Sequence, residues 1–358
     1  MSSVFVIAEA GVNHNGSLDT AKQLVEAAKS AGADAVKFQT FKAKNLVCQN
    51  ADKAEYQKKY TDNGESQFEM LRRLELSKSD HEQLISHCLG QGIQFLSSPF
   101  DHQSLSLLTK DFGLEAIKLG SGEITNAPLL LEIAATGCSL ILSTGMSGLD
   151  EVKQALGVLA FGYLDLEVEP NESLFEEAFD SFAGKMFLKS KITLLHCTTE
   201  YPAPYQDINL KAMDTLKDTF NIPVGYSDHS EGLAISLAAV ARGACVIEKH
   251  FTLDKNLPGP DHKASLEPTE FQQLVSGIRQ IEAALGNGEK RIMPSELTNR
   301  DVVRKSLVAA KPIKKGDFFS QDNLTIKRPG NGVQPIHYWN WLGREAMRDY
   351  KADEVISK

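Results

Sequence analysis

The chain has 358 residues, of which 24% are charged, and its formal net charge is −9. This acidic balance argues against nucleic acid or an anionic membrane as a partner, and an anionic substrate would need a local cationic pocket. A chain of this length can bury a full core and could hold one large domain followed by a small one.

The five cysteines are scattered along the chain without a CxxC pair, at Cys48, Cys88, Cys138, Cys197 and Cys245. Such usage is typical of free thiols in a reducing cytosol, so we expect a cytoplasmic protein without a disulfide framework. The first four residues lead directly into a strand-like run, and the longest apolar runs are of strand length or interrupted by charge. We therefore expect neither a signal peptide nor a membrane span.

Strand-like and helix-like patterns alternate from residue 4 to residue 285. The apolar runs of strand length lie at residues 4–10, 35–41, 94–100, 116–123, 139–146, 192–199, 223–230 and 245–252. Helical patterns separate them, at residues 17–31, 80–89, 103–110, 127–136, 149–159, 210–220, 232–242 and 268–285. Eight such units predict a (β/α)8 barrel, the TIM-barrel architecture of the α/β class. A doubly wound open sheet is the alternative, but GVNHNG (11–16) lacks the dinucleotide spacing and polar residues follow every strand, which favours the barrel.

Some segments do not fit the repeat. Residues 42–79 form a charged excursion, for which we expect a loop over the barrel mouth with a helix near 67–74. Residues 162–189 are acidic and predict a surface insertion with one short helix at 174–182. The composition then shifts after residue 286, and KKGD and PGNG turns with short strands indicate a small, mostly β domain. We expect a barrel at 1–286, a linker at 287–303 and the small domain at 304–358.

Two short polar segments lie at the ends of neighbouring strands of one βαβ unit. Ser227-Asp228-His229 ends one strand and Glu248-Lys249-His250 ends the next, and the following GPDHK turn adds Asp261 and His262. Parallel strands bring their carboxyl ends to one edge of the sheet, where α/β proteins place their chemistry. A single histidine at such a position would be interpreted as a cap, but two beside carboxylates predict a divalent metal site or a catalytic site.

The other strand ends carry lysines and hydroxyls that could form a cradle for phosphate or carboxylate. These residues are Lys37, Gln39, Ser97, Ser98, Lys118, Ser121, Glu123, Ser143, Thr144, His196, Thr198 and Ser227. We interpret His196, in an apolar run, as a core histidine, and His14, in the NHNG turn, as a turn residue that hydrogen-bonds the backbone.

Several motifs resemble those of the sialic acid synthase family. They are IAEAGVNHNG (7–16), KFQTF (37–41), SSPF (97–100), KLGSGE (118–123), LSTGM (142–146), HCTTEYP (196–202), GYSDHS (225–230), IEKHFTLD (247–254), GPDHKAS (259–265) and KRPGNG (327–332). The resemblance implies a barrel followed by an antifreeze-like (SAF) domain similar to type III fish antifreeze proteins. It also implies a homodimer in which each small domain covers the partner's barrel mouth.

The reaction implied by the resemblance is condensation of phosphoenolpyruvate with a 2-acetamido-mannose-type aldose, with release of phosphate. Matched positions imply that His229 and His250 bind manganese, or magnesium or cobalt in its place. They assign phosphoenolpyruvate to Lys37, Ser98, Lys118, Ser121, Ser143 and Ser227, with Thr199 near a point where many relatives have Asn. Residues facing the sugar would be Gln39, Glu123, Tyr201, Asp261 and Arg328. Glu9, Glu123, Asp261 or a water would handle protons, and the sequence does not choose among them.

Parts of AEAGVNHNG, KAKN and HCTTEYPAP are most similar to the legionaminate-making branch of this family. That branch implies 2,4-diacetamido-2,4,6-trideoxymannose as acceptor, and the alternative is N-acetylmannosamine, which gives N-acetylneuraminate. Functions of other classes are an ice-binding protein, suggested by the tail alone, and a barrel metallohydrolase, which usually has more carboxylate or histidine ligands.

Overall fold

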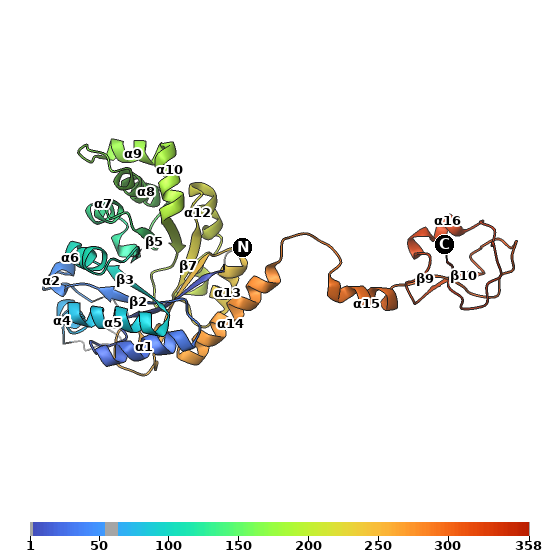
Figure 1. The fold of residues 1–358 in the computed structure, drawn as a ribbon, viewed down its shortest axis with the longest axis horizontal. Coiled ribbons are helices and arrows are strands. Elements are labelled where there is room, and N and C mark those ends of the chain that lie inside the picture. Colours follow the sequence, from blue (N-terminus) through green and yellow to red (C-terminus); the bar gives the residue numbers. More distant parts are fainter. Residues whose placement is uncertain (1–2, 54–63, 358) are drawn as a thin grey trace. The chain divides into compact units, whose positions relative to one another are not determined.

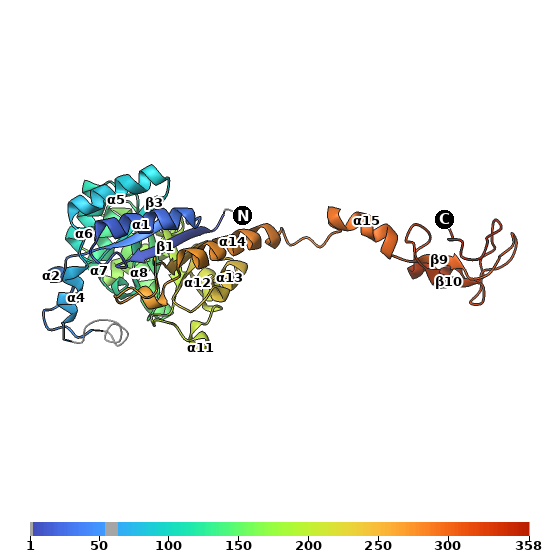
Figure 2. The same cartoon turned by 90° about the horizontal axis from the view of Figure 1, so that it is seen from below.

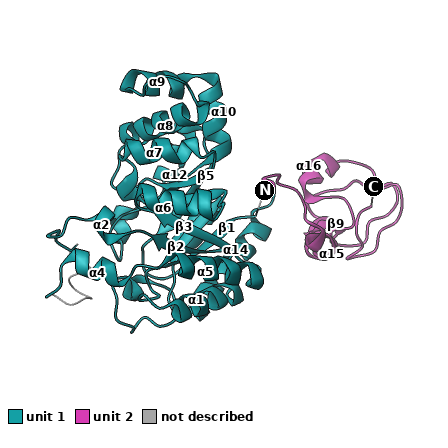
Figure 3. Ribbon diagram, turned by 60° about the vertical axis from the view of Figure 1, so that its left-hand side comes forward, with its two compact units in different colours: residues 1–286 teal, residues 287–358 magenta. Residues whose placement is uncertain are grey.

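The computed structural model describes residues 3–53 and 64–357 (Figure 1). The chain divides into two compact units, residues 1–286 and residues 287–358, which are coloured separately in Figure 3. The central part of the 42–79 excursion, residues 54–63, lies outside the described residues.

The first unit is built on eight parallel strands. They are β1 (Phe5–Gly11), β2 (Ala35–Thr40), β3 (Gln94–Pro99), β4 (Ala116–Leu119), β5 (Ser139–Ser143), β6 (Ile192–His196), β7 (Val224–Asp228) and β8 (Val246–His250). Their ladder runs in the order β3-β2-β1-β8-β7-β6-β5-β4, and β3 and β4 lie side by side at its two ends. Since β1 pairs with β8, the sheet curls into a nearly closed barrel. The predicted TIM-barrel architecture is confirmed, and the open doubly wound sheet was the wrong alternative.

Helices surround the strands (Figure 1). They are α1 (Leu18–Ser30), α5 (Lys78–Gln91), α6 (His102–Ser106) with a π-helical turn (Leu107–Asp111), α7 (Ala127–Ala135), α8 (Leu149–Leu164), α11 (Tyr205–Ile208), α12 (Ala212–Phe220), α13 (Ala234–Ala241) and α14 (Pro268–Leu285). Ser17 caps α1 as predicted, because its side chain accepts a hydrogen bond from the Thr20 amide. Helix α14 packs against α1 and α13, which closes the ring of helices beside β1 (Figure 2).

The insertion after β5 contains two helices, so the prediction of one short helix was wrong. Helix α9 (Glu172–Asp180) and helix α10 (Phe182–Lys191) are separated by Ser181, whose hydroxyl accepts from the Gly184 amide and starts α10. Helix α9 packs closely on α8 because Gly157 has no side chain: a Cβ there would lie 2.8 Å from the Phe175 carbonyl oxygen.

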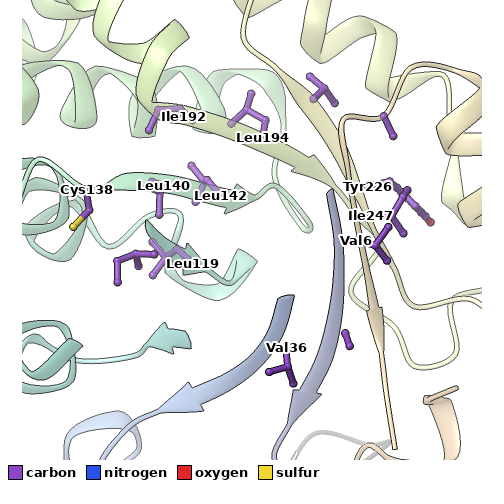
Figure 4. Packing of buried hydrophobic residues seen from close by; sticks show 14 of the residues in the cluster. Val6, Val36, Leu119, Cys138, Leu140, Leu142, Ile192, Leu194, Tyr226 and Ile247 are labelled. Carbon is purple, nitrogen blue, oxygen red and sulfur yellow. The ribbon is translucent and has the colours of Figure 1, made fainter. Parts of the chain in front are cut away.

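The strands alternate strictly between two environments. Outward side chains such as Val6, Val36 and Leu140 pack against the helices (Figure 4). Inward side chains at the strand starts form a separate apolar layer, made of Ile7, Ala35, Leu96, Leu195 and Val246. Two residues beyond Ile7, Ala35, Leu96 and Val246, the inward positions become polar, with Glu9, Lys37, Ser98 and Glu248. The barrel therefore has an apolar floor beneath a polar mouth.

Two short helices lie in the excursion after β2. They are α2 (Ala43–Leu46) and α4 (Gln67–Arg73), the second of which was predicted near this position. Ser66 and Glu69 form a capping box that fixes the start of α4. Met70, Leu71, Phe41 and Val12 build a small apolar cluster that is distinct from the main core.

The second unit begins with helix α15 (Pro294–Val303), within the segment expected to be a linker. Pro294 occupies the first turn, and the Glu296 carboxylate accepts from the Met293 amide, so a local start signal was present in the sequence. Beyond it, β9 (Ser306–Ala309) and β10 (Leu324–Lys327) pair antiparallel, followed by a 3-10 turn (Pro335–His337) and α16 (Tyr338–Trp341). A separate core around Leu307, Phe319 and Ile356 holds this unit together.

No helix within residues 3–53 and 64–357 is long and apolar enough to cross a membrane. All five cysteines are free.

One ion pair is fully buried between the barrel and helix α13. The Lys249 ammonium lies 3.0 Å from Asp228 Oδ2, and both side chains are inaccessible to solvent. The other contacts of Asp228 come from hydroxyls and an amide: Ser230 donates to Oδ1 from its amide and its hydroxyl, and Ser236 donates to Oδ2. Burial lowers the pKa of Lys249, and Asp228 opposes that shift.

Replacing Lys249 with Met should destabilise the barrel because it leaves the Asp228 charge buried without its cation. We expect a loss of about 3–5 kcal/mol in the free energy of unfolding, measured by urea denaturation. The matched control is Lys78→Met, which removes an exposed pair with Asp111 and should leave the free energy of unfolding almost unchanged. Equal losses in the two variants would contradict a structural role for the buried pair.

Candidate active site

A cavity of about 300 Å³ opens at the carboxyl ends of the strands. Most of the residues predicted from the sequence line it, and they lie on strands of the barrel or in the loops that follow the strands. They are Glu9, Lys37, Gln39, Ser98, Lys118, Ser121, Ser143, Thr199, Tyr201, Ser227, His229, His250 and Asp261.

Glu123 and Arg328 do not line this cavity. Glu123 ends a 3-10 turn (Ser121–Glu123), and its carboxylate accepts a hydrogen bond from Asn126 Nδ2 at 2.7 Å. Arg328 belongs to the second unit, where its Nε donates to the Val303 carbonyl at 3.0 Å.

Some strand-end residues that were expected in the anion cradle point away from it. Ser97 lies on the outer face of β3 and hydrogen-bonds Thr40, and Thr144 donates to the Leu195 carbonyl. Thr198 donates to the Asp207 carbonyl, and His196 bonds the Ile208 carbonyl. Their neighbours Ser98, Ser143, Cys197 and Thr199 take the inward positions because successive residues in a strand face opposite sides.

His14 and His262 make structural contacts. The His14 Nδ1 atom accepts from the Gly16 amide, and His262 contacts Thr252 at 2.7 Å and Asn15 at 3.4 Å.

Four buried ionisable side chains form the centre of the cavity. Lys37 Nζ lies 2.5 Å from Glu9 Oε2 and 3.6 Å from Glu248 Oε2, and Lys118 Nζ lies 3.2 Å from Glu248 Oε1. Ser227 donates to Glu248 at 2.7 Å. Glu248 was not predicted as a site residue. The signal for it was in the sequence, because Glu248 precedes His250 by two positions and must share its face of the strand.

The two glutamates differ in protonation although both are buried. Burial raises the pKa of Glu9 to about 7, and Lys37 only partly opposes that shift. Burial acts in the same direction on Glu248, but Lys118 and Lys37 outweigh it and lower the pKa of this carboxyl below its usual range. For Lys37, burial is outweighed by Glu248 and Glu9, which raise the pKa of the ammonium. At neutral pH the cavity thus holds an ionised Glu248 between two lysines, beside a Glu9 that can exchange a proton.

His229 and His250 lie side by side at the end of β7 and β8, with ring centroids 5.6 Å apart. Burial lowers the pKa of His229 to about 4, and burial together with His229 lowers the pKa of His250 well below its usual value. Both rings are therefore neutral. His229 Nδ1 donates to the Thr198 carbonyl at 2.7 Å, which leaves the lone pair on Nε2.

This pair fits a divalent cation. His250 Nδ1 is buried without a hydrogen-bond partner, and neutral imidazole nitrogens are good ligands for transition metals. Across residues 3–53 and 64–357, no cluster of three or more His, Cys, Asp or Glu side chains is arranged to hold a metal. Two histidines alone would leave most of the coordination sphere to oxygen ligands from outside the protein.

Two glycines let polar groups converge on the cavity. Gly11 has φ +51°, and a Cβ there would lie 3.1 Å from Glu9 Oε1 and 3.7 Å from Asp261 Oδ2. A Cβ on Gly145 would lie 2.4 Å from Thr199 Oγ1 and 2.8 Å from Ser121 Oγ, and the Gly145 amide donates to Ser121. Burial raises the pKa of Asp261 to about 6, so this carboxyl is a second group that titrates near neutrality.

Comparison with known proteins agrees with this geometry. Residues 24–290 match the NeuB family and residues 304–358 match the SAF domain. The chain is 53% identical to the N,N'-diacetyllegionaminic acid synthase of Campylobacter jejuni, over 99% of both chains. It is 48% identical to the protein of the same name from Legionella pneumophila, over 98% of this chain and 93% of that one. Its fold is similar to a crystal structure of N-acetylneuraminic acid synthetase from Leptospira borgpetersenii, with a TM-score of 0.66 and 34% identity, covering 83% of this chain and 90% of the other. The chain belongs to the NeuB family and carries a SAF domain at its C-terminal end.

Proposed function

We propose that this protein is a synthase that condenses phosphoenolpyruvate with 2,4-diacetamido-2,4,6-trideoxymannose to give N,N'-diacetyllegionaminate and phosphate. The observation that carries the proposal is the single cavity in which Lys37 and Lys118 flank Glu248 beside the neutral His229–His250 pair. The choice of sugar is supported by the two N,N'-diacetyllegionaminic acid synthases at 53% and 48% identity. N-acetylneuraminate is the weaker alternative, since the human N-acetylneuraminate-9-phosphate synthase is 34% identical.

The anionic substrate would bind to the cationic part of the cavity. Lys37 and Lys118 are both buried, so a phosphate or carboxylate there would interact with them at low dielectric. Ser98, Ser121, Ser143 and Ser227 supply hydroxyls at the same level of the barrel, and Ser143 Oγ is buried without a hydrogen-bond partner. An oxygen of phosphoenolpyruvate would satisfy this hydroxyl.

The reaction joins carbon 3 of phosphoenolpyruvate to the aldehyde carbon, while water adds at carbon 2 and phosphate leaves with the electrons of its carbon–oxygen bond. The attacking water loses both of its protons as it becomes the keto oxygen: the aldehyde oxygen gains one of them and the departing phosphate gains the other. Glu9 is the best placed of the three candidate carboxyls, because it lines the cavity and has a pKa of about 7. Asp261 is the second candidate, whereas Glu123 lies outside the cavity lining.

We propose manganese as the resident cation of His229 and His250, with magnesium or cobalt as alternatives. When bound, the cation supplies Lewis-acid polarisation of the aldehyde. The protein holds the two imidazoles neutral by burial and fixes the His229 ring through the Thr198 carbonyl.

The two functions from other classes have less support. Ice binding would leave the buried ionic cavity of the barrel unexplained. A metallohydrolase would usually have a third protein ligand, which the described residues do not provide.

We also propose a cytoplasmic homodimer in which the SAF domain of one chain serves the barrel mouth of the other. The free cysteines support a reducing compartment. The dimer is supported by the family membership, and by the small size of the unit formed by residues 287–358.

The proposed reaction predicts release of phosphate from phosphoenolpyruvate only when an aldose is added. Measuring kcat/KM for both aldoses should show a clear preference for 2,4-diacetamido-2,4,6-trideoxymannose, at least about 10-fold over N-acetylmannosamine. Preference for N-acetylmannosamine would overturn the choice of sugar. Absence of phosphate release with both would overturn the proposed reaction.

Replacing His229 or His250 with Ala should reduce turnover at least about 100-fold, because the aldehyde loses its Lewis acid. Chelation of the wild-type enzyme should do the same, and added manganese should restore activity. His102→Ala is the matched control, since His102 is exposed and contacts Glu132 at the surface. Full activity of the metal-stripped wild-type enzyme would rule out the metal role.

The dimer predicts that Arg328→Ala loses most activity while remaining folded, because a fixed guanidinium fork no longer reaches the sugar of the partner subunit. Mixing this variant with His229→Ala after subunit exchange should restore about a quarter of wild-type activity, since half the dimers are mixed and each has one intact site. Confirmed exchange without any recovery would show that Arg328 acts within its own chain or not at all.

A further inference from the structure

One side of the cavity is mostly apolar, with Gln67 of α4 as its polar member. Leu46, Val47, Leu71 and Phe100 line it, and we call these four residues the apolar wall. Leu46 ends α2, Leu71 lies in α4 and Phe100 follows β3, so the wall is assembled from the excursion after β2 and the next strand.

The wall has its own supporting core. All four residues pack in the small cluster with Val12, Phe41, Ala43 and Met70, apart from the main core of the barrel. Leu71 is 9% exposed, whereas Leu46, Val47 and Phe100 are half-buried with part of their surface facing the cavity. Half-buried apolar side chains lining a cavity of this kind are suited to contact an apolar part of a ligand.

The ionic centre of the cavity fixes which part of the sugar can reach this wall. The aldehyde carbon must lie near His229, His250 and Glu9, where the condensation takes place. The acetamido group on carbon 2 is next to that carbon and stays near the polar centre. Carbon 6 is at the opposite end of the sugar chain, so it extends away from the charges.

We propose that the apolar wall receives the carbon 6 methyl group of the sugar and is the element that selects a 6-deoxy aldose. This inference rests on the proposed function and names the residues that choose its sugar. A carbon 6 hydroxyl placed against these four apolar side chains would lose hydrogen bonds to water, and none of the four could replace them. An apolar pocket discriminates against such a hydroxyl by about 10- to 100-fold.

The test compares two aldoses that differ only at carbon 6: 2-acetamido-2,6-dideoxymannose and N-acetylmannosamine. Wild-type enzyme should prefer the 6-deoxy sugar in kcat/KM by about 10- to 100-fold. Val47→Thr keeps the branched shape, which suits the extended backbone of Val47 (φ −136°, ψ 149°), and adds one hydroxyl to the wall. It should lower the preference at least about fivefold, and Leu46→Asn should lower it as well, with KM for phosphoenolpyruvate unchanged.

The matched control is Val12→Thr, because Val12 belongs to the same cluster but does not line the cavity. It should leave the sugar preference at its wild-type value. The inference is overturned if neither wall variant changes the preference, or if Val12→Thr changes it equally. These results differ from failure of the proposed function, in which no aldose would release phosphate from phosphoenolpyruvate.

Discussion

The site depends on one buried carboxylate. Glu248 lies between Lys37 and Lys118 and accepts a hydrogen bond from Ser227, all within the cavity at the mouth of the barrel. Two ammonium groups at this depth would be costly to bury alone, and one carboxylate that contacts both reduces that cost. The cluster carries excess positive charge when Glu9, the other carboxyl beside Lys37, is protonated. A polyanionic substrate is the natural complement of such a centre. An acidic protein can therefore bind an anion without a positive surface.

Burial shifts the pKa of each ionisable group in the cavity towards its neutral form. Charged neighbours decide which groups stay ionised in spite of burial. His229 and His250 stay neutral because burial dominates their pKa values. The pKa of Glu9 is about 7 because Lys37 only partly offsets the effect of burial. Glu248 remains ionised because two lysines surround it. One cavity thus supplies two neutral imidazoles, a fixed negative charge and a group that exchanges protons at physiological pH.

The cavity is lined by two parts of the structure, the barrel strands and the excursion after β2. The ionic centre stands on the barrel strands, whose inward positions are fixed by the ladder. The apolar wall stands on α2, α4 and the segments around them, which have a small core of their own. Chemistry on rigid strands and selectivity on a connecting excursion is the arrangement that lets one barrel serve different acceptors.

Most of the fold followed from the sequence, because the alternation of strand and helix patterns determines the order of units in a barrel. Only part of the site could be predicted from the sequence. Ser98 and Ser143 were predicted together with Ser97 and Thr144, since a motif alone does not say which of two neighbours faces inward. Glu248 could have been found by counting two positions back from His250. The apolar wall could not, because Leu46, Leu71 and Phe100 become neighbours only when the excursion folds back over the barrel.

The most direct test of this account is calorimetric titration of phosphoenolpyruvate, without aldose, into the wild-type protein and Lys118→Met. The account predicts one binding site per chain in the wild type and affinity at least about 10-fold weaker in the variant, because a buried charged hydrogen-bond donor is lost. Lys78→Met, an exposed lysine, serves as the control and should bind as the wild type does. Equal binding by Lys118→Met and the wild type would contradict the central claim that the buried lysines around Glu248 form the anion site.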